Sequence, residues 1–65
     1  MQPHQERVIL EKRELDDKLN KLAAFLQGGI FAALAAEDRE LLKQQAHHMK
    51  EYSVILAKRI ANFKP

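Results

Sequence analysis

The strongest constraint on the fold is a regular spacing of apolar and small side chains in the second half of the chain. These side chains recur at alternating intervals of four and three residues, at Leu42, Ala46, Met49, Ser53, Leu56, Ile60 and Phe63. A helix with about 3.6 residues per turn places such positions in one continuous stripe. Neither Gly nor Pro interrupts residues 36–63. The spacing therefore predicts a long helix near residues 36–63 that packs along this seam against another helix.

A second stripe, half of it apolar, runs beside the seam on the same predicted helix. Its members are Leu41, Gln45, His48, Tyr52, Ile55 and Arg59. Two interpretations of this stripe remain open. Its apolar residues either form a partly exposed edge of the core, or they bind a second copy of the chain, because one seam is enough to dock one helix.

The first half of the chain predicts another long helix, near residues 4–27. Pro3 is compatible with a first helical turn, and Glu6 places negative charge near the helix start. A heptad frame follows, with apolar residues at Val8, Leu15, Leu19, Leu22 and Leu26. Lys12 occupies the seam position between Val8 and Leu15, where a lysine can snorkel to solvent or specify the register.

The segment between the two helices, residues 28–35, is predicted to be a compact linker. Gly28 and Gly29 suit the left-handed conformation that often closes a helix. Ile30, Phe31 and Leu34 follow in a stretch too short for an independent helix, and we expect them to plug the end of the hairpin. The sequence as a whole predicts one all-α domain over residues 1–65, an antiparallel helical hairpin.

Composition limits how such a hairpin is stabilised. The chain has 65 residues and no cysteine, so disulfides and thiolate metal sites are excluded. Its longest apolar runs fall far short of the roughly 20 residues that span a bilayer, and its N-terminus lacks the apolar region of a secretory signal. We therefore expect a cytoplasmic protein that does not bind membranes.

A lone pair of helices shares only one interface, so we expect the hairpin to self-associate. The simplest product is a dimer that closes a four-helix bundle, although a higher homo-oligomer fits the sequence as well. The residues assigned to the seam of this bundle are Leu15, Leu19, Leu22, Leu26, Leu42, Met49, Leu56, Ile60 and Phe63.

Catalytic and metal-binding patterns are weak in this chain. His47 and His48 are adjacent, so they point about 100° apart on a helix, whereas helical ligand pairs are three or four residues apart. Asp16 and Asp17 diverge for the same reason. Ser53 lies on the seam, where we expect it to allow close helix approach or to bond a carbonyl of its own helix. The sequence predicts a protein that is not an enzyme and has neither metal nor cofactor.

Positive charge gathers in the C-terminal part of the chain. Residues 1–42 carry a net charge of −2, and residues 43–65 carry +4. A basic C-terminal half suits an anionic ligand, and it equally complements the negative end of a helix dipole without any ligand. The candidate ligand-binding residues combine cations with one aromatic ring, and they are Lys12, Lys43, His47, Lys50, Tyr52 and Arg59. Such a set is typical of phosphate binding and base stacking, and it is also compatible with an ordinary solvated basic face.

Two segments, PHQERVILEKRELDDKLNKL and LLKQQAHHMKEYSVILAKRI, resemble a group of short, mostly uncharacterised phage and prophage proteins. The shared positions are Arg7, Val8, Glu11, Lys12, Glu14, Leu15, Lys18, Lys21 and Leu22, then Leu42, Gln45, Met49, Tyr52, Leu56, Arg59 and Ile60. The resemblance implies a phage origin and hence the host cytoplasm. Small phage proteins often bind host factors, and some oligomeric helical ones sequester nucleotide immune signals.

Three functions follow as hypotheses. The first is an oligomeric counter-defence protein that sequesters a nucleotide-like small molecule. The alternative is an interaction protein that occludes a host protein through its helical surface. An architectural nucleic-acid binder is the third, and the small net charge and acidic first helix argue against it.

Overall fold

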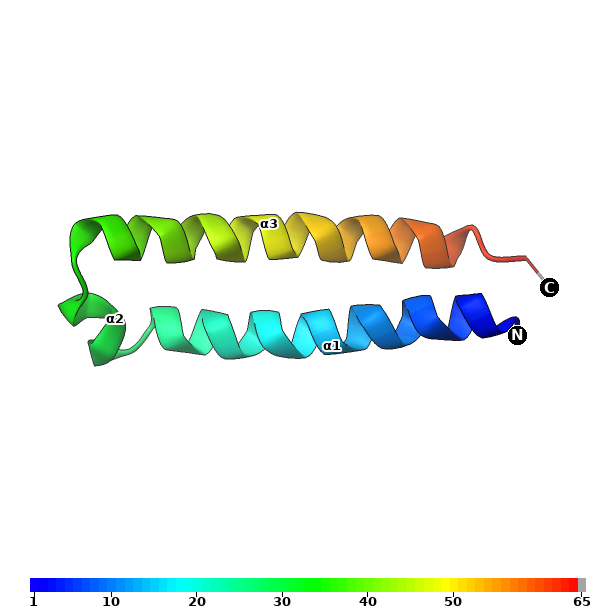
Figure 1. Cartoon of the computed structure of the whole chain (residues 1–65), viewed down its shortest axis with the longest axis horizontal. Helices are drawn as coiled ribbons and strands as arrows, with labels where there is room; N and C mark the ends of the chain where they lie inside the picture. The colour runs from blue at the N-terminus through cyan, green and yellow to red at the C-terminus, as the bar shows by residue number, and fades with distance from the viewer. Residues whose placement is uncertain (65) are drawn as a thin grey trace.

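The computed structural model describes residues 1–64, and it contains three helices. The long helices α1 (Pro3–Leu26) and α3 (Ala36–Ala61) run antiparallel, and the short helix α2 (Gly29–Ala33) joins them at the closed end (Figure 1). Both ends of the described part of the chain lie at the open end. No residue in the described range forms a strand. The prediction of an all-α, antiparallel helical hairpin is confirmed.

The ends of the long helices follow from local chemistry. At the start of α1, the backbone N–H of Gln2 donates to Gln5 Oε1 over 3.0 Å, and Pro3 takes the position where no N–H is needed. Helix α3 begins after Ala35 without a side-chain cap. Its first turn carries Glu37 and Asp38 and its last turn carries Lys58 and Arg59. These charges oppose the partial charges at both ends of the helix and stabilise it.

The turn after α1 differs from the prediction of a left-handed glycine. Gly28 is extended, with φ −94° and ψ 167°, and neither described glycine has a positive φ. The backbone N–H groups of Gln27 and Gly28 instead donate to carbonyl oxygens of the preceding turn, over 3.1 Å to Ala24 and 3.0 Å to Phe25. The helix therefore ends by a tightened last turn, for which a positive φ is not required.

The linker also differs from the expectation. The segment that was predicted to be too short for an independent helix contains the single-turn helix α2. Ile30, near the start of α2, is 70% exposed. Ile30 therefore does not plug the hairpin. Phe31 is half-buried, and its ring packs edge-on against Phe25 with centroids 6.4 Å apart. This aromatic pair attaches α2 to the end of α1.

The core is the interface between α1 and α3. Leu56 is fully buried and Val8 is 6% exposed, and Ser53 and Gln5 are the buried polar residues. Gln5 also donates from Nε2 to the carbonyl oxygen of Lys64 over 3.4 Å, which joins the two ends of the chain. The remaining seam residues on both long helices are half-buried. The seam thus packs within one hairpin, and its apolar residues stay partly in contact with solvent.

The hairpin is thin and exposes much apolar surface. It extends over 49 × 14 × 13 Å and exposes 5147 Å². A folded monomer of 7.5 kDa is expected to expose only about 4,200 Å². On α3, the aliphatic side chains of Leu41 and Ile55 are each 55% exposed. In the described residues, no helix has both the length and the apolar character needed to cross a membrane.

Candidate functional site

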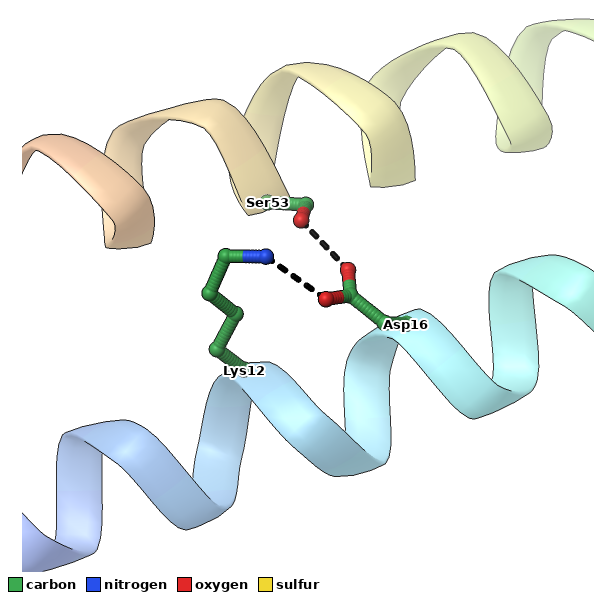
Figure 2. A network of polar contacts seen from close by, with 3 residues as sticks. All are labelled: Lys12, Asp16 and Ser53. Carbon is green, nitrogen blue, oxygen red and sulfur yellow. Dashed lines mark hydrogen bonds and ion pairs between the residues drawn. The ribbon is translucent and has the colours of Figure 1, made fainter.

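A polar network crosses the interface between α1 and α3 (Figure 2). Lys12 Nζ donates to Asp16 Oδ2 over 2.6 Å, one turn along α1. From α3, the Ser53 hydroxyl donates to the other carboxylate oxygen, Asp16 Oδ1. Asp16 therefore accepts from both helices at once. Each carboxylate oxygen of Asp16 has its own partner. Ser53 and Asp16 can therefore bond only when α1 and α3 pack in this register.

This network changes the interpretation of its members. Ser53 was expected to allow close helix approach or to bond a carbonyl of its own helix. Its hydroxyl instead donates across the interface to Asp16. Lys12 was a candidate for ligand binding, and its ammonium group is occupied by Asp16 in a half-buried position. An anionic ligand would have to compete with the Asp16 carboxylate for Lys12. The sequence signal for this pairing was the lysine on the seam together with an acid four residues later.

The network makes part of the folding stability depend on pH. The hydrogen bond from Lys12, reinforced by the one from Ser53, holds the pKa of Asp16 below its ordinary value of 3.8. The ionised carboxylate is therefore favoured by folding. Its stabilising contribution is present above pH 3.8 and is lost as the pH falls through the lower pKa of the folded state.

We therefore expect Asp16→Asn to lower the free energy of unfolding at neutral pH and to weaken its decrease on acidification. Urea unfolding followed by circular dichroism between neutral pH and about pH 2 measures both effects. The matched control is Asp17→Asn, because Asp17 pairs with Lys21 over 3.0 Å at the exposed surface, where ion pairs contribute little. If the free energy of unfolding fell equally with pH in the parent and in Asp16→Asn, the Asp16 carboxylate would not be the source of the acid dependence.

The candidate ligand residues on α3 lie on two opposite flanks of that helix. At about 100° per residue, the second stripe lies roughly a quarter-turn from the seam in one direction. We name it the tyrosine flank, after Tyr52, which is 43% exposed, and it includes Arg59, which is also exposed. The lysine flank, with Lys43, His47 and Lys50, lies a similar angle away in the other direction, and its residues are exposed.

A single chain therefore does not bring the six candidate residues together. Lys12 lies in the hairpin interface, Tyr52 and Arg59 lie on one side of α3, and the lysine flank lies on the other. A hollow of about 320 Å³ at the open end is lined by Met1, Gln5, Phe63 and Lys64. None of the six candidates lines it. Any site that combines the two flanks needs a further molecule beside α3.

The adjacent histidines His47 and His48 lie side by side on the exposed surface of α3. The rings of His47 and His48 lie edge to face, with centroids 5.4 Å apart. Among residues 1–64, no group of three or more His, Cys, Asp or Glu side chains is placed to hold a metal ion. The two residues leave α3 about 100° apart, as adjacent positions require, and their rings contact each other.

Arg39 is a residue that the sequence reasoning did not single out. It lies in the first turns of α3, half-buried, and its Nε atom is buried without a hydrogen-bond partner in the described part of the chain. It extends the spacing of the seam by three residues before Leu42. This spacing was the sequence signal that Arg39 lies at a seam position, although a charged residue is unusual at such a position.

The fold and the exposed flanks define a small helical-hairpin protein whose candidate site is an open helix surface. The chain belongs to the Sequestin family, whose family model matches residues 2–62. It is also 42% identical over 64 residues to a protein of Enterobacteria phage T4, described as an uncharacterised 7.5 kDa protein in the denB–rIIB intergenic region. That alignment covers 98% of this chain and 100% of the phage protein. No solved structure matches the chain.

Proposed function

We propose that this chain is a non-enzymatic phage accessory protein that sequesters a nucleotide-like, anionic small molecule. In this role it would act in the cytoplasm of the host as a counter-defence protein, by lowering the free concentration of an immune signal. The match to the Sequestin family over residues 2–62 supports a sequestering role, as the family name suggests. The relationship to a T4 protein of similar length supports the phage context.

The class of ligand is inferred from Tyr52 and Arg59, which are both exposed on one flank of α3. The two residues are two helical turns apart, about 10 Å along the axis. An exposed aromatic ring stacks on a base, and a guanidinium binds a phosphate through two parallel hydrogen bonds. Together they favour a ligand with both a base and a phosphate.

Self-association is part of the proposal because one convex helix surface cannot enclose a ligand. High-affinity sites are usually concave and bury most of the ligand. A second copy beside α3 would supply the other wall, and it would cover Leu41 and Ile55, each 55% exposed. Lys43, His47 and Lys50 lie on the opposite flank of α3, so they would not contact a ligand held at Tyr52 and Arg59 of the same copy.

The test is thermal shift followed by calorimetry against cyclic dinucleotides, cyclic ADP-ribose isomers and linear nucleotides. One member of the panel should stabilise the protein, and Tyr52→Ala and Arg59→Ala should each weaken its binding by about 10-fold or more, since stacking and charge-assisted bonds contribute ~1–3 kcal/mol. Lys21→Ala is the control, because it removes a cation from an exposed pair on α1. Unchanged affinity in both flank variants would contradict this site.

A second function, occlusion of a host protein, is favoured by the aliphatic residues of the tyrosine flank. Leu41 and Ile55 are exposed apolar side chains that lie beside Tyr52 and Arg59, two residue types that are enriched among interface hot spots. This alternative predicts a host protein that co-purifies with the parent and is lost with Ile55→Asp, together with no binding in the nucleotide panel. Binding to random duplex DNA with a steep salt dependence would instead support an architectural role.

A further inference from the structure

The exposed residues on one side of α3 form a pattern that is symmetric about His48. Outward from His48 the intervals are four, three and four residues in both directions. Toward the N-terminus they give Gln44, Leu41 and Glu37, and toward the C-terminus they give Tyr52, Ile55 and Arg59. All seven residues are exposed. We call this set the symmetric stripe. It lies on the same side of α3 as the tyrosine flank and shares with it Leu41, His48, Tyr52, Ile55 and Arg59.

We propose that two copies of the chain pair through the symmetric stripe, with their α3 helices antiparallel and a two-fold axis at His48. In this arrangement Leu41 lies opposite the partner's Ile55, and Ile55 opposite the partner's Leu41. Tyr52 lies opposite the partner's Gln44, and His48 opposite its own copy. A two-fold interface requires such self-complementarity, because each contact occurs twice.

Charge complementarity selects the antiparallel direction. The first turn of α3 carries Glu37 and Asp38, and its last turn carries Lys58 and Arg59. Antiparallel pairing places Glu37 opposite the partner's Arg59 at both ends of the stripe. Parallel pairing would place each acidic turn beside the same acidic turn, and it would also align the two helix dipoles unfavourably. The chemistry at the ends and at the aliphatic positions thus supports the same register.

The exposed area of the hairpin matches what a stable dimer buries. The chain exposes 5147 Å², which exceeds the expectation for its mass by roughly 900 Å². A standard protein interface buries about 800 Å² on each partner. The excess surface is therefore of the size that one such interface would remove.

Pairing through the stripe leaves the hairpin intact. The stripe lies about a quarter-turn around α3 from Ser53 and Leu56, so the α1–α3 interface does not have to open. The inference rests on the self-association proposed above and does not depend on the ligand. A guanidinium has several N–H donors, so an Arg59 that pairs with the partner's Glu37 keeps donors for an anion. Tyr52 lies at the edge of the stripe nearest the α1–α3 seam, where a base can stack beside the interface rather than within it.

The two adjacent histidines provide a matched test, since the natural chain has no cysteine. His48→Cys places a thiol at the proposed axis, and His47→Cys places one on the opposite flank. Under mild oxidation, or with a short bismaleimide, His48→Cys should form a covalent dimer at least 10-fold faster than His47→Cys. Circular dichroism of both reduced variants confirms that the helices remain folded.

A second arm tests the register away from the axis. Leu41→Cys and Ile55→Cys should cross-link when the two proteins are mixed, and each alone should cross-link at least 10-fold more slowly. Cross-linking of His47→Cys as fast as His48→Cys would overturn the proposed face. A monomer by light scattering at high micromolar concentration would overturn it too, as would a dimer in which His48→Cys fails to cross-link. A dimer with the expected cross-links that binds no nucleotide would support this interface and contradict only the proposed ligand.

Discussion

Leu56→Asp is expected to leave the chain largely unfolded at 25 °C. Leu56 is the fully buried residue of the α1–α3 interface. Removing a buried leucine side chain costs ~2–5 kcal/mol through lost contacts and the cavity. An unpaired carboxylate in the same position adds several kcal/mol. A folded chain of 65 residues has a total stability of only about 3–10 kcal/mol, so the substitution exceeds or exhausts it.

Val54→Asp is the matched control for this prediction. Val54 is two positions away on the same helix and 42% exposed, and it lies on the side of α3 opposite the tyrosine flank. The free energy of unfolding of Val54→Asp should therefore lie within about 1 kcal/mol of that of the parent. Far-ultraviolet circular dichroism with thermal melting measures both variants. If Leu56→Asp melted with the parent, Leu56 would not lie in the core of the protein in solution.

The second large effect is expected from Ile55→Asp, which should dissociate the proposed oligomer and keep the helices. Ile55 is 55% exposed in the single hairpin, so half of its side chain remains to be buried by a partner. In a two-fold interface the substitution occurs twice, and together the two lost contacts amount to about 2–3 kcal/mol. The dissociation constant should rise roughly 100-fold.

Analytical ultracentrifugation over a concentration series measures this change. Val54→Asp again serves as the control, because it adds the same charge one residue away on the opposite flank. It should associate like the parent. Equal weakening by both variants would show that added negative charge, rather than the face containing Ile55, controls the association.

The hairpin itself was predictable from local rules. The alternating four and three spacing from Leu42 to Phe63 requires only helical periodicity, and the same holds for the heptad frame of α1. Those positions lie in the interface, buried or half-buried. The exposed second stripe was also visible in the sequence, because its residues follow the same periodicity at a different angle.

The features that the sequence did not predict depend on tertiary placement or on backbone choice. The bond between Ser53 and Asp16 joins residues 37 positions apart, so it exists only once the register of the two helices is set. The end of α1 was not predicted correctly because glycine adopts the left-handed and the extended backbone conformations with similar ease. Gly28 takes the extended one. The separation of Lys43 from Tyr52 follows from helical geometry, because nine residues at about 100° each place them on opposite sides of α3.

The most direct test of sequestration is a depletion and recovery measurement. The protein is mixed with a substoichiometric amount of the nucleotide that the binding panel identifies, the mixture is filtered, and the free nucleotide is quantified by mass spectrometry. The protein fraction is then heated and the released material is measured. We predict that the free nucleotide falls in proportion to the added protein, and that heating returns it chemically unchanged, with both effects lost in Arg59→Ala. Free nucleotide that stays constant, or a returned product of altered mass, would contradict the account.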